Sequence, residues 1–134
     1  INKADTFRFT ELQRIDEAIA ISSISIARNM NVKAIVALTE SGSTALMMSR
    51  IRSDIPIYAF TRNEYTQRRV GLYRGVKSYP YKFKAKSFSE VLSEVSKELL
   101  DSEMVKLGDL VIITSGSPLK VEGYTNSLRI VAIK

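Results

Sequence analysis

The chain has 134 residues, the size of one ordinary domain, and its 45% hydrophobic and 25% charged residues are typical of a globular protein. It contains no cysteine and no histidine. These absences exclude disulfides, thiolate metal sites, thiol nucleophiles and a Ser-His-Asp triad, and they remove the commonest general base near neutral pH. No signal peptide or membrane-spanning run is found, so we expect a cytoplasmic protein.

The net charge of +6 is unevenly distributed along the chain. Ten Lys or Arg residues and only two acidic residues lie between positions 50 and 86, a net +8 for this segment. Such a segment is either a solvated helical face or a field that attracts anions, such as phosphorylated metabolites or a nucleic acid.

The first half of the chain alternates helical and strand patterns. Residues 6–30 have helical spacing, with Thr10 as candidate N-cap. The expected apolar stripe of this helix comprises Leu12, Ile15, Ala18, Ile19, Ile21, Ile24 and Ile26. A buried strand is predicted over 32–38, a helix over 43–52 and a second strand over 56–61. A helix over 63–75 follows, capped by Asn63, weakened by Gly71 and ended by Gly75.

The second half continues the alternation and then breaks it. A strand over 76–83 contains Pro80, which places it at a strand end or sheet edge. The helix over 87–104 has a capping box of Ser87 and Glu90, and strands are predicted over 110–115 and 127–134. This order predicts one three-layer α/β domain over residues 1–134: a mostly parallel five-stranded sheet with helices on both faces. The last strand is predicted to be antiparallel, because its connection is too short for a helical crossover.

Two loops leave the carboxyl ends of predicted strands, where open α/β sheets bind ligands. The first, "TESGST", combines a glycine with hydroxyl side chains at the start of a helix, a pattern suited to a phosphate. The alternative is that Ser41 or Ser43 only caps the helix. The second loop, "SGSPLKVEGYTN" (residues 115–126), is either the other wall of a small-ligand pocket or an ordinary hairpin connection. Neither loop ends in the Gly-Lys-Ser/Thr of a P-loop, and no catalytic carboxylate pair or metal cluster is found.

Several motifs, in order, resemble one family. The segments "TESGSTALMMSRIRSDIPIYAFTRNEYTQRRVGLYRGV", "KLGDLVIITSG" and "GYTNSLRI" are similar to the C-terminal domain of pyruvate kinase, over residues 17–134. The sequence Thr-Glu-Ser-Gly before Thr-Ala-Leu, and the upstream segment "RFTELQRIDEAIA", most resemble bacterial forms that respond to sugar monophosphates or AMP. The resemblance implies a regulatory domain without cofactors of its own, in a tetramer whose separate barrel domain holds the catalytic machinery, magnesium and potassium.

The resemblance also assigns the effector site. The expected effector-binding residues are Thr39, Glu40, Ser41, Gly42, Ser43, Thr44, Ser115, Gly116, Ser117, Gly123 and Thr125. Many family members have Arg or Lys at the position of Ser43, and members that bind fructose 1,6-bisphosphate often lack the carboxylate of Glu40. A carboxylate would oppose a second phosphate, so a monophosphate effector is predicted. The alternatives are a basic nucleic-acid-binding module and a purely structural oligomerisation domain.

Overall fold

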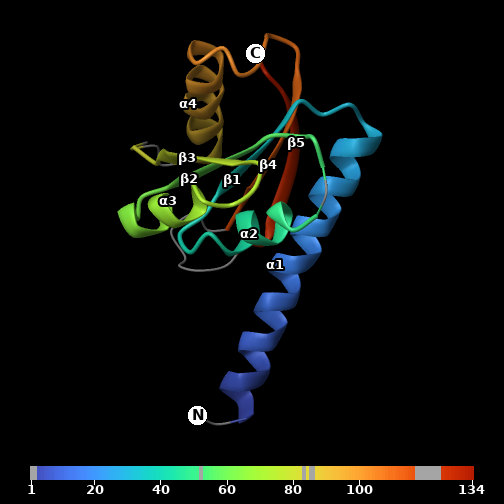
Figure 1. The fold of residues 1–134 in the computed structure, drawn as a ribbon, viewed down its shortest axis with the longest axis vertical. Coiled ribbons are helices and arrows are strands. Elements are labelled where there is room, and N and C mark those ends of the chain that lie inside the picture. The colour runs from blue at the N-terminus through green and yellow to red at the C-terminus, as the bar shows by residue number, and fades with distance from the viewer. Residues whose placement is uncertain (1–2, 52, 83, 85–86, 117–124) are drawn as a thin grey trace.

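The computed structural model describes residues 3–51, 53–82, 84, 87–116 and 125–134, and Figure 1 shows their arrangement. Four helices and five strands occur in these residues. In chain order they are α1 (Lys3–Asn29), β1 (Ala34–Leu38), α2 (Ser43–Ser49), β2 (Ile57–Thr61), α3 (Glu64–Val70), β3 (Val76–Pro80), α4 (Phe88–Asp101), β4 (Leu110–Ser115) and β5 (Ser127–Ala132).

The five strands form one sheet in the order β3-β2-β1-β4-β5. The pairs β1–β2, β1–β4 and β2–β3 are parallel, while β5 runs antiparallel to β4. The predicted fold class is therefore confirmed, including the antiparallel last strand. The edge position of β3, with Pro80 as its last residue, is confirmed as well.

Strand alternation divides the core between the two faces of the sheet. Ile35 of β1 and Ile112 of β4 pack with α1 and α2, whereas Val36 and Ile113 pack against α4. Figure 1 shows α4 on one side of the sheet and α2 and α3 on the other. The central strands β1 and β2 are buried along their whole length because helices cover both of their faces.

Three helices end earlier than the sequence prediction, and α2 ends at Ser49 rather than at residue 52. Helix α3 ends at Val70, with Gly71 as its C-cap, so the predicted continuation to Gly75 was wrong. Gly75 has a φ of +74° and forms the turn into β3, whose first residue follows it directly. Helix α4 ends at Asp101 rather than 104, whereas its predicted N-cap is confirmed: the Ser87 hydroxyl accepts a hydrogen bond from the Glu90 amide.

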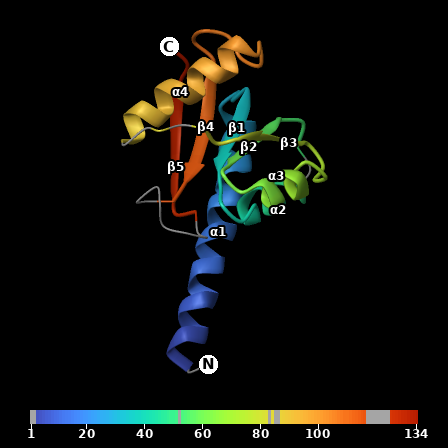
Figure 2. The same ribbon diagram turned by 90° about the vertical axis from the view of Figure 1, so that its left-hand side faces the viewer.

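Helix α1 shows the largest departure from prediction. It begins at Lys3, so Thr10 lies inside the helix and is not its N-cap. The buried stripe of its described side chains is also different, since Ile15 and Ile21 are 40% and 53% exposed. Within residues 14–29, the part of α1 whose side chains are described, the buried residues are Asp16, Ala20, Ser23, Ile24 and Ala27, whereas the side chain of Leu12 lies outside this part. Most of them are small, which lets α1 pack closely against α2 and the sheet. In both Figure 1 and Figure 2 the N-terminal part of α1 extends away from the sheet.

Candidate functional site

The candidate site lies at the carboxyl edge of the parallel strands. Strands β1 and β4 are neighbours, but β1 is followed by α2 on one face, while the chain reaches β4 from α4 on the other face. The loops after these two strands therefore leave the sheet at its topological switch point, where ligands bind in this class of fold. The first loop comprises residues 39–44, which we call the β1–α2 loop.

The β1–α2 loop is held by its own hydroxyl groups. The Thr39 hydroxyl accepts a hydrogen bond from the Gly42 amide at 2.9 Å, and the Ser41 hydroxyl accepts one from the Ser43 amide at 3.2 Å. The N-cap position of α2 is Gly42, which provides no side-chain cap, so Ser43 does not have the capping role considered from the sequence. The first i to i−4 bond of the helix runs from Leu46 to Gly42, so the amides of Thr44 and Ala45 precede it.

Helix α3 supports the β1–α2 loop from behind. The Thr66 hydroxyl donates to the Glu40 carbonyl at 2.8 Å, and the Arg69 guanidinium donates to the Ser41 carbonyl. Gly42 has a φ of +81°, and a Cβ atom at this position would lie 2.6 Å from Cγ1 of Val70. Glycine is thus required twice over, by the left-handed backbone and by the close approach of α3. The loop is positioned by a neighbouring helix rather than by its sequence alone.

A buried hydrogen-bond chain joins the β1–α2 loop to the residues before β5. The Thr44 hydroxyl donates to the Thr125 hydroxyl at 2.7 Å, although the two residues are 81 positions apart. The Thr125 amide donates in turn to Oδ1 of Asp16 on α1, also at 2.7 Å. Burial raises the pKa of the Asp16 carboxyl, and the hydrogen bond from Thr125 partly opposes this effect. The expected proximity of the two loops is thus observed at Thr44 and Thr125.

The other predicted residues of the second loop do not share the contact that Thr125 makes with the β1–α2 loop. The Ser115 hydroxyl lies 3.1 Å from the Ser127 hydroxyl, which donates to the Ser115 carbonyl at 3.0 Å. Ser115 therefore bridges β4 and β5, and its hydroxyl is not joined to the β1–α2 loop by any hydrogen bond that we observe among the described residues. Gly116 follows it, half-buried, at the end of β4. Ser117 and Gly123 lie outside the described residues.

Arg62, which directly follows β2, contacts an aromatic ring just beyond the end of β3. The Arg62 guanidinium lies 4.5 Å from the centroid of the Tyr81 ring. Burial raises the pKa of the Tyr81 hydroxyl; Arg62 lowers it, and the carboxylates of Glu94 and Glu40 raise it further. The Arg62 guanidinium therefore lies over this ring, whereas Arg69 supplies positive charge to the β1–α2 loop, which has no basic residue of its own.

Sequence reasoning missed Asp16, Thr66 and Arg69, which contact the two loops from other elements. Asp16 was missed because an acidic residue in an amphipathic helix is ordinarily expected to face solvent. Arg69 was missed because the sequence does not distinguish it from the other basic residues between positions 50 and 86. The one informative signal was Asp16 itself, since it stands four residues before Ala20 in a stripe of small residues.

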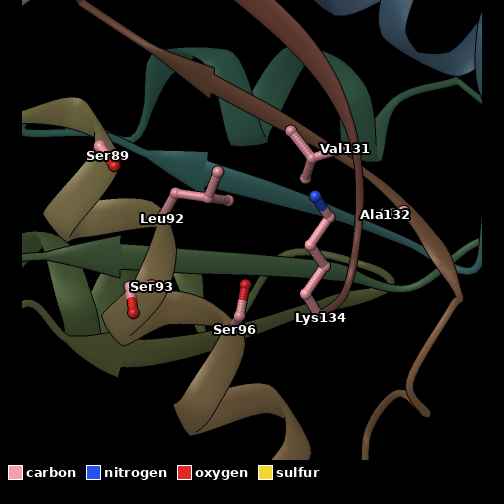
Figure 3. Close-up of a pocket in the computed structure, with 7 residues that line it drawn as sticks. All are labelled: Ser89, Leu92, Ser93, Ser96, Val131, Ala132 and Lys134. Atoms are coloured by element: carbon pink, nitrogen blue, oxygen red, sulfur yellow. The ribbon is translucent and has the colours of Figure 1, made fainter.

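A second hollow lies away from this site, between α4 and β5. It has a volume of about 400 Å³ and is lined by Ser89, Leu92, Ser93, Ser96, Val131, Ala132 and Lys134 (Figure 3). In Figure 3 the side chains of Leu92 and Val131 lie toward each other across it.

The described part of the chain contains no group of three or more Asp or Glu residues placed to hold a metal ion. Every helix in that part is too short or too polar to cross a bilayer.

The fold is similar to one part of two solved pyruvate kinase structures. A crystal structure of a pyruvate kinase from Cryptosporidium parvum superposes with a TM-score of 0.76 at 30% sequence identity, covering 90% of this chain and 23% of that one. A second structure, of the C. parvum pyruvate kinase in complex with ADP, gives the same TM-score and identity and has 24% of its chain covered.

The sequence comparisons agree with the structural ones. The family model described as "Pyruvate kinase, alpha/beta domain" matches residues 17–131. Pyruvate kinase II of Salmonella typhimurium is 40% identical over 126 residues, covering 92% of this chain and 26% of the relative. The pyruvate kinase of Staphylococcus aureus is 42% identical over 113 residues, covering 84% of this chain and 19% of the relative. The chain therefore belongs to the pyruvate kinase family, as its alpha/beta domain, and spans about a quarter or less of the length of these relatives.

Proposed function

We propose that this chain is the regulatory domain of a pyruvate kinase and binds a phosphorylated effector, most favourably a sugar monophosphate or AMP. The complete protein would transfer phosphate from phosphoenolpyruvate to ADP in the cytoplasm. Its catalytic barrel, with magnesium and potassium, would lie outside this domain in the same chain. The observation that carries the proposal is the hydrogen bond between Thr44 and Thr125, which joins the two polar loops at the switch point of the sheet.

The side chains around the loops favour one phosphate over two. The hydroxyls of Thr39 and Ser41 are held close to the start of α2, and Arg69 reaches the same loop from α3. The Arg69 guanidinium donates to the Ser41 carbonyl, so it supplies positive charge to this loop in place of the basic residue that many family members have at the position of Ser43. The half-buried Glu40 adds a negative charge to the same loop, which would repel a second phosphate group.

A titration of the complete enzyme tests this proposal. Ribose 5-phosphate, glucose 6-phosphate, AMP and fructose 1,6-bisphosphate would be compared by calorimetry, and a monophosphate is expected to bind most tightly. The double variant Ser41→Ala with Thr44→Ala should abolish binding, whereas Ser93→Ala, an exposed serine of α4, is the matched control. Absence of binding by all four metabolites contradicts the proposal. Tight, salt-dependent binding of DNA or RNA instead would support the nucleic-acid alternative.

A second function, contact between subunits, is favoured by the exposed edge of the sheet. Among the described residues, strand β5 pairs with β4 alone, and it presents apolar side chains on both faces. Ile130 is 39% exposed, and Val131 lines the hollow shared with α4. Unpaired strand edges of this kind readily pair with another chain. We propose that β5 contributes to a homo-oligomer, a tetramer in the complete enzyme.

Sedimentation of the complete enzyme tests the subunit contact. Ile130→Glu places a charge on the β5 face and should shift the assembly toward smaller species. Leu72→Glu is the matched control, because Leu72 is 86% exposed in the turn after α3. An unchanged oligomer in the Ile130 variant, or equal dissociation in both variants, contradicts an interface at β5.

A further inference from the structure

Asp16 is a buried carboxylate that the proposed ligand site does not use. It lies in the middle of α1, with 2% of its surface exposed, on the face that packs toward the sheet. A buried charged group is costly unless it is hydrogen-bonded, so a buried carboxylate in a stripe of alanine and serine needs a structural reason. That reason is the backbone amide of Thr125, which donates to it.

The contacts of Asp16 continue into the ligand site. Thr125 is 4% exposed and Thr44 is 1% exposed, so both bonds of the chain Asp16–Thr125–Thr44 are shielded from water. Hydrogen bonds in such surroundings are stronger than in water, and they are lost at greater cost when one partner is removed. Each of the three residues belongs to a different segment: α1, the residues before β5, and the first turn of α2.

Helix α1 is a rigid element that leads away from this site. It has 27 residues and thus a length of about 40 Å at 1.5 Å per residue. In Figures 1 and 2 its N-terminal part extends beyond the sheet, while the part that follows Asp16 packs against the domain. The projecting part and the part that carries Asp16 belong to one continuous helix, so a displacement at Asp16 changes the direction in which the projecting part points.

We propose that Asp16 is a positioning residue that couples occupancy of the two loops to the placement of α1. The inference rests on the proposed function, because it takes the β1–α2 loop and Thr125 as the walls of the ligand site. A ligand that binds the β1–α2 loop and shifts Thr44 disturbs the buried hydrogen bonds that link Thr44 to Thr125 and Thr125 to Asp16, and the position of α1 changes with them. Because such coupling is reciprocal, a contact that fixes the projecting part of α1 also alters the affinity of the β1–α2 loop for its ligand.

Variants of Asp16 in the complete enzyme test this coupling. Asp16→Ala removes the acceptor for the Thr125 amide, Asp16→Asn retains an acceptor oxygen, and Glu17→Ala is the control at the adjacent exposed position. Ribose 5-phosphate and AMP serve as probes. Calorimetry gives the dissociation constant of each probe, and steady-state kinetics give the shift that it causes in half-saturation by phosphoenolpyruvate.

The wild-type shift is expected to lie within the usual range for allosteric coupling, about 5- to 150-fold. It should fall toward unity in Asp16→Ala, remain substantial in Asp16→Asn, and equal the wild-type value in Glu17→Ala. If Asp16→Ala binds a probe and keeps the full shift, the coupling role of Asp16 is overturned while the effector site stands. If the wild-type enzyme binds neither probe, the proposed effector site fails, and the coupling fails with it.

Hydrogen exchange on the wild-type enzyme gives a test that does not depend on a folded variant. Saturation with the probe that binds should slow amide exchange in residues 14–29 of α1 as well as in residues 39–44. Exchange that slows in the loop and is unchanged in α1 contradicts the proposal, because the ligand would then act without the helix.

Discussion

Replacing Gly42 by alanine tests whether helix α3 sets the shape of the β1–α2 loop. Gly42 has a φ of +81°, and an added Cβ would lie 2.6 Å from Cγ1 of Val70 and 3.3 Å from Cγ2 of Thr66. Val70 is fully buried and cannot move away without disturbing the core. The substitution therefore combines backbone strain with a steric clash, and both must be relieved by displacement of the loop from α3.

The two contributions can be separated in magnitude. A left-handed conformation costs an L-residue about 1–2 kcal/mol, and overpacking of a filled core costs about 1–3 kcal/mol. We expect Gly42→Ala to lower the free energy of unfolding by about 2–5 kcal/mol in total. Gly108→Ala is the matched control, because Gly108 has a φ of +88° but no heavy atom within 4 Å of its added Cβ. The control should cost only the backbone contribution, about 1–2 kcal/mol.

Urea unfolding followed by circular dichroism measures both variants, provided that the slope of the transition stays constant. Truncating the clashing partner should restore part of the loss, so Gly42→Ala with Val70→Ala is expected to be less destabilised than the two single changes predict. If Gly42→Ala and Gly108→Ala lower the free energy of unfolding equally, the reasoning is refuted, because the contact with α3 would then contribute nothing to stability. Strict additivity with Val70→Ala would refute it independently.

Three further predictions concern charge, capping and pH. Arg69→Gln should weaken binding of a phosphorylated probe and reduce the salt dependence of its affinity, whereas Arg74→Gln, an exposed arginine after α3, should leave both unchanged in calorimetry. Ser87→Ala removes the N-cap of α4 and should cost about 1 kcal/mol in urea unfolding; no loss would mean that the cap is energetically silent. Because burial raises the pKa of Asp16 above 3.8, the folded state binds its proton more tightly than the unfolded state. The stability of wild type relative to Asp16→Asn should therefore fall as pH rises from about 3.8 through the raised pKa, and level off above it. A difference that is flat or rises over this window contradicts a raised pKa.

Local pattern was sufficient for the order and type of the elements. Residues 34–38 form a continuous apolar run, as expected for a strand covered on both faces, and the stripe of α4 has the period of three to four residues of a helix. The short connection before β5 was enough to predict its antiparallel direction. The ends of elements were less predictable: α3 stops at Val70, where the chain turns toward β3, and α1 begins seven residues before its expected cap.

The sequence by itself thus determined the α/β sheet, its edge strand with Pro80, the family resemblance and the polar β1–α2 loop. It could not determine the partners of that loop. Asp16 and Thr125 are 109 positions apart, and Thr44 and Thr125 are 81 apart, so their contacts exist only because β1 and β4 are neighbours in the sheet. The same holds for Arg69, which reaches Ser41 because α3 packs against the β1–α2 loop at Gly42. Contacts between distant segments follow from sheet order and helix packing, and these were decided by the tertiary structure.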